Sequence, residues 1–286
     1  MGGFNFEKSL GTSKKPVILI PYINTIKGKD FENNYQLEDF DFGVDLKIPI
    51  GNSLNLDATL SPDFSQVEVD DQIVNTTKWE TRLPEKRQFF TQNSDLFSNF
   101  GTRESQAFFS RRIGVAKNKD GKSVENKILA GVRLSGKINN STRIGLLNIM
   151  TTEDIINEIP QNNNTLITFN KKVFSRSNIS LFLLNRENTK KYDFISDSGR
   201  YNRVIGAEYN LANNDGSWSG KAFIHKSILP DKSNNKKSLN TSIRITRNSR
   251  NHFINFYSAY VGDNHRSDLG YLSLIHISEP TRHERI

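Results

Sequence analysis

The sequence predicts an all-β protein: an antiparallel meander that forms part of an outer-membrane-type β-barrel and carries one irregular, charged segment. Three observations lead to this prediction. Long runs of residues alternate between apolar and polar side chains, as strands with one apolar face do. The turns between these runs are alternately short and long, as in transmembrane β-barrels. No run of about 18 apolar residues is present, so a transmembrane helix is not expected.

The composition fits strands that are apolar on one face only. Apolar residues make up 35% of the 286 residues, which is low for a soluble globular chain. The 19 Phe residues nevertheless argue against a disordered chain. The absence of Cys excludes disulfides, thiolate metal sites and a Cys nucleophile. The net charge of +8 is compatible with an anionic membrane surface, acidic glycans or nucleic acid, and equally with solvated loops.

The N-terminal third contains a β-hairpin. Asp41–Ile50 alternates strictly, and the alternation resumes over Leu54–Leu60 after a Gly51-Asn52 turn. An earlier strand is expected over Val17–Ile26. Pro21 lies inside it, and because proline cannot donate to a strand ladder, this strand is expected at an edge or a bulge.

The second half predicts a regular series of hairpins. Aromatic residues recur near the strand ends and could form interfacial girdles; they are Phe174, Tyr201, Tyr209, Trp218 and Tyr260. In the loop between the first two hairpins, Thr151–Ile159 predicts a short helix with acids in its first turn. The expected strand pairs are 128–138 with 143–150, 166–174 with 179–185, 204–211 with 218–225, and 239–247 with 253–261. A soluble up-and-down barrel or sandwich would show the same alternation.

The chain is divided into three parts by composition. Residues 1–13 are interpreted as a leader remnant and 14–271 as the barrel fragment. Leu272–Arg282 reads LSLIHISEPTR and resembles the translated end of an adapter used in preparing sequencing libraries. We therefore expect residues 272–286 to be a non-native tail, and the natural protein to continue beyond residue 271. The alternative is a final strand over residues 272–277.

Ser61–Gly114 breaks the alternating pattern. This charged segment holds eight acids, seven bases and many Phe residues. Such near-balanced charge predicts a folded, ion-paired element, in which partly desolvated charges must be paired. Within a barrel it would lie in the lumen or cap one mouth.

Several blocks of residues carry a resemblance to a known family. The first stretch contains Pro62, Asp63, Phe64, Gln66, Val67, Glu68, Asp70 and Asn75, the second Pro84, Glu85, Lys86, Arg87, Phe89, Phe90, Asp95 and Phe97, and the third Phe109, Ser110, Arg111, Arg112, Ile113 and Gly114. In their order and spacing they resemble the bacterial outer-membrane β-barrel family of unknown function that follows a family-nine-type (DOMON-like) carbohydrate-binding module. We call residues 84–87 the first charged motif and residues 109–114 the second charged motif.

The resemblance implies a location in the cell outer membrane and partners among its lipids, including lipopolysaccharide. It also implies contact with glycans through a carbohydrate-binding module that is missing here. The family supplies no catalytic residues, and no cofactor or metal is expected. The histidines His225, His252 and His265 lack the spacing of metal ligands, and no nucleotide-binding loop is present. Nucleic acid is not an expected partner.

The only candidate catalytic residues are the carboxylates Glu68, Asp70 and Glu85. Glycoside hydrolysis uses two acids about 5–9.5 Å apart, and Glu68 and Asp70 would share one face of an extended strand. The alternative is that these acids pair with arginines of the same segment, such as Arg111 and Arg112. A metal site at Glu68, Asp70 and Asp71 lacks the ligand loop of a calcium site.

The sequence thus favours an outer-membrane β-barrel protein with a role in transport or in surface glycan handling. Two alternatives remain open. One is a glycan hydrolase that uses acids of segment 61–85, and the other is a soluble β-sandwich binding module.

Overall fold

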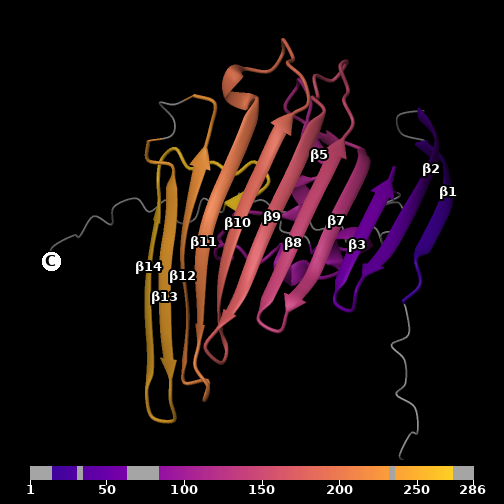
Figure 1. Ribbon diagram of the computed structural model, residues 1–286. Helices are drawn as coiled ribbons and strands as arrows, with labels where there is room; N and C mark the ends of the chain where they lie inside the picture. Colours follow the sequence, from indigo (N-terminus) through magenta and orange to yellow (C-terminus); the bar gives the residue numbers. More distant parts are fainter. Residues whose placement is uncertain (1–14, 31–34, 63–83, 232–235, 273–286) are drawn as a thin grey trace, which may run out of the picture.

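The computed structural model describes residues 15–30, 35–62, 84–231 and 236–272. Over these residues the protein is one large, twisted, antiparallel sheet of 11 strands (Figure 1). Neighbours in the sheet are neighbours in the chain, except that residues 61–127 lie between β3 and β7. The strands are β1 (Ile18–Asp30), β2 (Tyr35–Ile50), β3 (Leu54–Leu60), β7 (Ile128–Asn139), β8 (Thr142–Thr151), β9 (Asn162–Val173), β10 (Ser177–Asn188), β11 (Tyr201–Ala212), β12 (Trp218–Ile228), β13 (Leu239–Asn248) and β14 (Phe253–Val261).

This strand series confirms the all-β antiparallel meander and every hairpin that the alternation predicted. The sheet is open, with β1 and β14 as its two edges. Pro21 lies in β1, so the proline is on an edge strand, as expected. None of the described helices is long and apolar enough to cross a membrane.

The connections differ in length between the two ends of the sheet. The short turns gather at the lower end in Figure 1, and the longer connections after β8, β10 and β12 gather at the upper end. We call these the short-turn end and the long-loop end. The η3 turn (Asp197–Gly199) belongs to one of the long loops.

One face of the sheet, here called the covered face, is packed against other parts of the chain. Leu147, Leu166, Leu184 and Val204 are consecutive partners across β8 to β11, and each is at most 2% exposed. They form one hydrophobic cluster with Phe97, Phe100 and Phe108 and with further apolar side chains of the covering segment.

The opposite, open face carries apolar side chains that nothing in the described chain covers. One row crosses five strands, with Leu134, Leu146, Ile167, Leu183 and Ile205 as consecutive partners. On the covered face, by contrast, buried positions include charged and polar side chains. The sheet therefore has apolar side chains on both faces, whereas a soluble sheet with one covered face turns a polar face to water.

The covering layer consists of residues 84–114 and 262–272. It contains α1 (Gln88–Thr91), η1 (Ser94–Leu96) and η2 (Ser110–Arg112). Within it, β4 (Ser105–Gln106) pairs with β15 (Tyr271–Leu272). A second small sheet, β5 (Val115–Lys117) with β6 (Ser123–Glu125), lies near the long-loop end. The layer therefore joins two segments that are about 160 residues apart in sequence.

The covering layer fits against glycines of the sheet. A Cβ atom at Gly145 would lie 2.7 Å from Cε1 of Phe97, and one at Gly131 would lie 3.1 Å from Cζ of Phe89. Both glycines are on the covered face. Their missing side chains let the aromatic rings approach the backbone of the sheet.

The helix expected over Thr151–Ile159 is wrong. Asp154 instead pairs with Ile159 in an isolated antiparallel bridge. The Asp154 carboxylate accepts hydrogen bonds from the backbone N–H and the side-chain amide of Asn157, at 3.1 and 2.7 Å. Such local bonds from an Asp side chain offer the backbone a turn in place of a helix. Of the tail expected from residue 272, the structure describes only Leu272, at the end of β15.

Candidate functional site

The first and second charged motifs form one unit around Arg87. The Arg87 guanidinium donates to both carboxylate oxygens of Glu85, at 2.8 and 2.7 Å. It also donates to the carbonyl oxygens of Ser110 and Ile113, at 2.8 and 2.7 Å. Arg87 is buried, and a buried guanidinium of this kind needs such partners. The motifs that carry the family resemblance are therefore joined in space by one side chain.

Gly114 and Arg111 complete this unit. Gly114 has φ of +98°, a conformation that side-chain-bearing residues rarely adopt, and a Cβ there would lie 3.2 Å from Nη1 of Arg87. Arg111 donates through Nε and Nη2 to the carbonyl oxygen of Pro84. Its Nε is 3.9 Å from Glu85, so the expected pairing of this arginine with an acid of the segment is a looser contact than that of Arg87.

Glu85, one of the three candidate catalytic acids, is an ion-pair partner in this unit. Burial raises the pKa of its carboxyl, but the hydrogen bonds and charge of Arg87, with a hydrogen bond to Ser110, outweigh burial and hold the pKa below its ordinary value. A general acid needs the opposite shift. Glu85 therefore matches the ion-pair alternative. Glu68 and Asp70, like Asp63, Phe64, Gln66 and Val67 of the first motif stretch, lie outside the described residues.

A polar pocket of about 550 Å³ lies at the long-loop end of the covered face. The covering layer contributes Arg112 and Asp268 to its lining, and the sheet contributes Asn162, Asn164 and Arg186. Among the lining residues that the structure describes, four cationic side chains stand against two carboxylates. The remaining charged lining residues are Lys117, Glu158 and Arg266.

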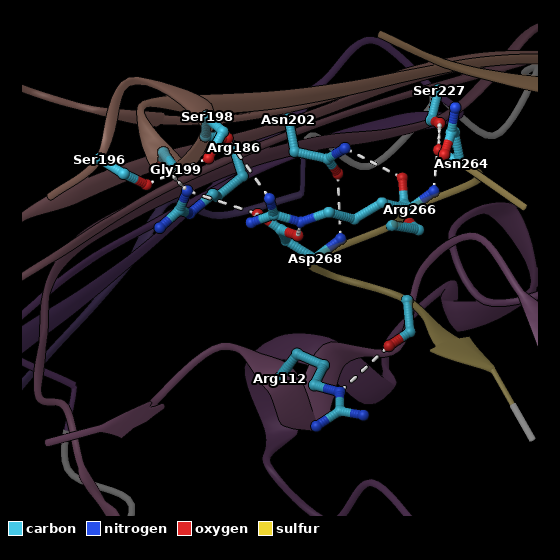
Figure 2. A network of polar contacts seen from close by, with 12 residues as sticks. Arg112, Arg186, Ser196, Ser198, Gly199, Asn202, Ser227, Asn264, Arg266 and Asp268 are labelled. Carbon is cyan, nitrogen blue, oxygen red and sulfur yellow. Dashed lines mark hydrogen bonds and ion pairs between the residues drawn. The ribbon is translucent and has the colours of Figure 1, made fainter. Parts of the chain in front are cut away.

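Asp268 contacts two of the arginines that line the pocket (Figure 2). Its carboxylate accepts two hydrogen bonds from Arg266, at 2.5 and 2.9 Å. Arg186, on β10, reaches the same carboxylate with Nη1 at 3.4 Å and donates to the carbonyl oxygen of Gly199 at 2.6 Å. The two arginines thus share one carboxylate, and the three side chains together keep a net positive charge.

Strand residues hold Arg266 and Asp268 in place. Asn202, on β11, donates to the carbonyl oxygen of Arg266 at 2.9 Å and accepts from the backbone N–H of Asp268 at 3.0 Å. Ser227, on β12, accepts from the backbone N–H of Arg266 at 3.1 Å. Figure 2 shows these bonds between the strands and the segment that carries Arg266 and Asp268. Both strand residues are at most 1% exposed, so the positions of the charged groups depend on a rigid part of the sheet.

Two amide oxygens in the pocket have no hydrogen-bond partner among the described residues. They are the Oδ1 atoms of Asn162 and Asn164, and Asn164 is 4% exposed. Buried polar groups in proteins are rarely left unpaired, and each exception calls for a ligand, a water molecule or another explanation. Both asparagines line the pocket, so its sheet side holds two buried acceptors without a described partner, and the arginines supply donors.

A second polar cluster lies on the covered face nearer the short-turn end. Oε1 of Glu208 accepts from the backbone N–H of Gly101 at 2.5 Å and lies 2.8 Å from Nε2 of His225. Its other oxygen lies 2.8 Å from Nζ of Lys221. Because Gly101 belongs to the covering layer and Glu208 to β11, this cluster attaches the layer to the sheet. Within the described part of the chain, no group of three His, Cys, Asp or Glu side chains could hold a metal ion.

The sequence pattern does not predict the pocket. The strands expected from the alternation, 166–174 and 179–185, leave out both Asn164 and Arg186, and Asp268 lies beyond the last expected strand, 253–261. The Asn162–Asn164 triplet at the start of β9 was a usable signal, since three amides are unusual in a strand. Without the register of β8 to β11, however, nothing indicated which of them faces the covering layer.

The fold and the site define a class of all-β protein: a large open antiparallel sheet with one bare apolar face and one face covered by a charged segment that encloses a polar pocket. A family model described as a domain of unknown function, DUF5916, matches residues 16–279. The chain belongs to this family. No curated protein and no solved structure matches the chain.

Proposed function

We propose that the chain forms part of an outer-membrane β-barrel protein, with the open face of the sheet against lipid and the covered face toward the lumen. The observation that carries this proposal is the bare apolar open face, which lies opposite a covered face with buried charged side chains. Leu181 and Ile224, near the middle of their strands, are 47% and 50% exposed, whereas Arg133 and Glu208 on the covered face are 1% and 3% exposed.

The extent of the bare face supports lipid as its neighbour. A second open-face row, through Ile144, Phe169, Leu181, Ala207 and Ile224, runs beside the row described above. Monomeric soluble proteins rarely expose apolar patches larger than a few hundred Å², and larger ones are typical of contact surfaces. An apolar face that continues over so many strands is expected for strands that cross a bilayer.

At the ends of the open face, where a membrane interface would begin, polar and tyrosine side chains replace the apolar ones. Toward the long-loop end, Asn148, Thr165, Asn185 and Arg203 form a polar row across β8 to β11. Tyr201 and Tyr209 lie on the open face of β11 eight residues apart, or about 27 Å along a strand. On a strand tilted by about 40° the two rings would lie about 21 Å apart across the membrane, close to the height of about 25 Å of the apolar band between aromatic girdles.

The covering layer supports a luminal position for the charged segment. In bacterial barrels the longer loops face the cell exterior, so the polar pocket at the long-loop end would open outward. There it would meet solutes or glycans before they pass the layer, in keeping with a role in transport or surface glycan handling. Loop lysines and arginines would meet lipopolysaccharide phosphates. The hydrolase alternative gains no support from Glu85, because its carboxylate is engaged by Arg87.

Fractionation of cells that produce the full-length protein tests this proposal. We expect recovery in the outer-membrane fraction after a high-pH wash, and a gel mobility that changes when the sample is heated. Recovery in the soluble fraction without detergent, with the same mobility before and after heating, would favour the soluble β-sandwich alternative and overturn the proposal.

A further inference from the structure

The polar pocket at the long-loop end combines two features that one kind of ligand would satisfy together. Its described lining residues carry more positive than negative charge, and on the sheet side two amide oxygens have no partner among the described residues. We propose that this pocket binds a small sugar acid, a molecule with one carboxylate and several hydroxyl groups. The proposal deepens the role in glycan handling and rests on it for the source of the ligand, but it does not depend on the membrane location.

The carboxylate is assigned to the arginine side of the pocket. Arg186 uses Nη1 for its contacts with Gly199 and Asp268. Its Nε and Nη2 donate to no other described residue. Arg186 and Arg266 share the single carboxylate of Asp268, so a second carboxylate would relieve the repulsion between the two guanidinium groups. Arginine is suited to this task because its planar donors match a carboxylate.

The hydroxyl groups are assigned to the asparagine side. Asn162 Oδ1 and Asn164 Oδ1 accept no hydrogen bond from any described residue. A ligand hydroxyl can donate to such an oxygen, whereas phosphate or sulfate offers mainly acceptors. Asn162 donates its own amide N–H to the carbonyl oxygen of Pro160 at 3.1 Å, which holds its side chain in one orientation. The acceptor of Asn162 is therefore oriented before a ligand arrives.

The size of the pocket also fits a molecule larger than a simple ion. Its volume of about 550 Å³ lies within the range of about 300–1,000 Å³ that small-molecule sites occupy. A single inorganic anion would contact the arginines but would leave the asparagine floor unfilled. A sugar acid can span both sides.

Calorimetric titration of the full chain in detergent tests the proposal with galacturonate, galactose, acetate and inorganic phosphate as probes. We expect saturable binding of galacturonate and binding at least about tenfold weaker for the other three, because each of them lacks one of the two recognised groups. Equal binding of phosphate or acetate would show a plain anion site, and equal binding of galactose would show a neutral-sugar site. Either result, or no saturable binding of galacturonate, overturns the proposal.

Variants locate the binding in the pocket. Arg186→Gln and Asn164→Ala should each weaken galacturonate binding about tenfold or more. The Asn164 side chain makes no hydrogen bond to another described residue, so its variant should keep the fold even where that of Arg186 does not. Arg203→Gln is the matched control, because Arg203 lies on the opposite face next to Asn185, and it should leave the affinity unchanged. Folded variants of Arg186 and Asn164 with unaltered affinity would contradict the assignment.

These measurements separate the binding proposal from the membrane proposal. Binding is measured on protein in detergent, whereas fractionation concerns the location of the protein in the cell. A soluble protein that binds galacturonate would overturn only the membrane proposal. An outer-membrane protein without such binding would overturn only the ligand proposal.

Discussion

Arg133 and Asp57 form a buried ion pair between directly paired positions of β7 and β3. Arg133 donates to Oδ2 of Asp57 through Nη2 at 2.7 Å and through Nε at 3.2 Å. The two residues are 1% and 4% exposed. Nη1 of Arg133 also donates to the carbonyl oxygens of Phe89 and Gln92 in the covering layer. This one side chain therefore links two strands and the layer above them.

Replacing Arg133 with Met should destabilise the protein strongly. The change leaves the Asp57 carboxylate buried without its charge partner, and removal of one member of a buried pair typically costs about 3–5 kcal/mol. The free energy of unfolding, measured by urea titration of the refolded full chain in detergent, checks this expectation.

Arg143→Met is the control for the Arg133 variant. Arg143 pairs with Asp95, whose side chain is 58% exposed, so this loss should cost only about 0–1 kcal/mol. If both substitutions cost the same, the burial of the Asp57–Arg133 pair would not be what determines its contribution.

Gly145→Ala should destabilise the contact between the sheet and the covering layer. The new methyl group would lie 2.7 Å from both Cε1 of Phe97 and Oγ1 of Thr168. Overpacking of this kind costs about 1–3 kcal/mol. Combining the change with Phe97→Leu should cost less than the sum of the two single changes, because the smaller side chain makes room for the methyl group. Strict additivity of the urea-unfolding free energies would argue against this contact.

Glu85→Gln should reduce the loss of stability that the protein suffers in acid. The pKa of Glu85 is below its ordinary value of 4.5 in the fold, so the unfolded chain binds the proton more readily than the folded protein. Glu85 therefore adds stability above about pH 4.5, and this contribution is lost as the pH falls through its folded pKa. Unfolding free energies measured between about pH 6 and pH 3 should fall less steeply in the variant. An unchanged slope would be inconsistent with the Arg87 pairing.

Leu181→Arg tests which environment the open face meets. Against lipid, a charge near the middle of a strand should cost about 2–4 kcal/mol, measured as the unfolding free energy in phospholipid vesicles. Asn185→Arg, on the same face but in the polar row, should cost about 0–1 kcal/mol. On a soluble protein, both changes would be nearly neutral, within about 0.5 kcal/mol. Equal and small effects at the two positions would therefore count against the lipid contact.

Much of the fold was predictable because its pattern is local. Alternation over Asp41–Ile50 and Leu54–Leu60 around a Gly-Asn turn specifies a hairpin without any distant contact. Pro21 indicated an edge strand for a reason confined to one residue, its missing N–H. Thr151–Ile159 was predicted wrongly because helix propensity and the side-chain bonds of Asp154 compete over the same few residues, and the bonds prevailed.

The sequence by itself determined the class of fold, the hairpins and the charged segment that departs from them. Each of these depends on a pattern among residues that are close in sequence. Only the tertiary structure decided that Arg87 joins the two charged motifs, and that Asn164, Arg186 and Asp268 share one pocket. The physical reason is register. A strand's side chains alternate between its faces, so a slip of one residue would turn Asn164 and Arg186 toward the open face. Residues 262–272 run back across the sheet and are held there by Asn202. This path brings Asp268 to Asn164 and Arg186.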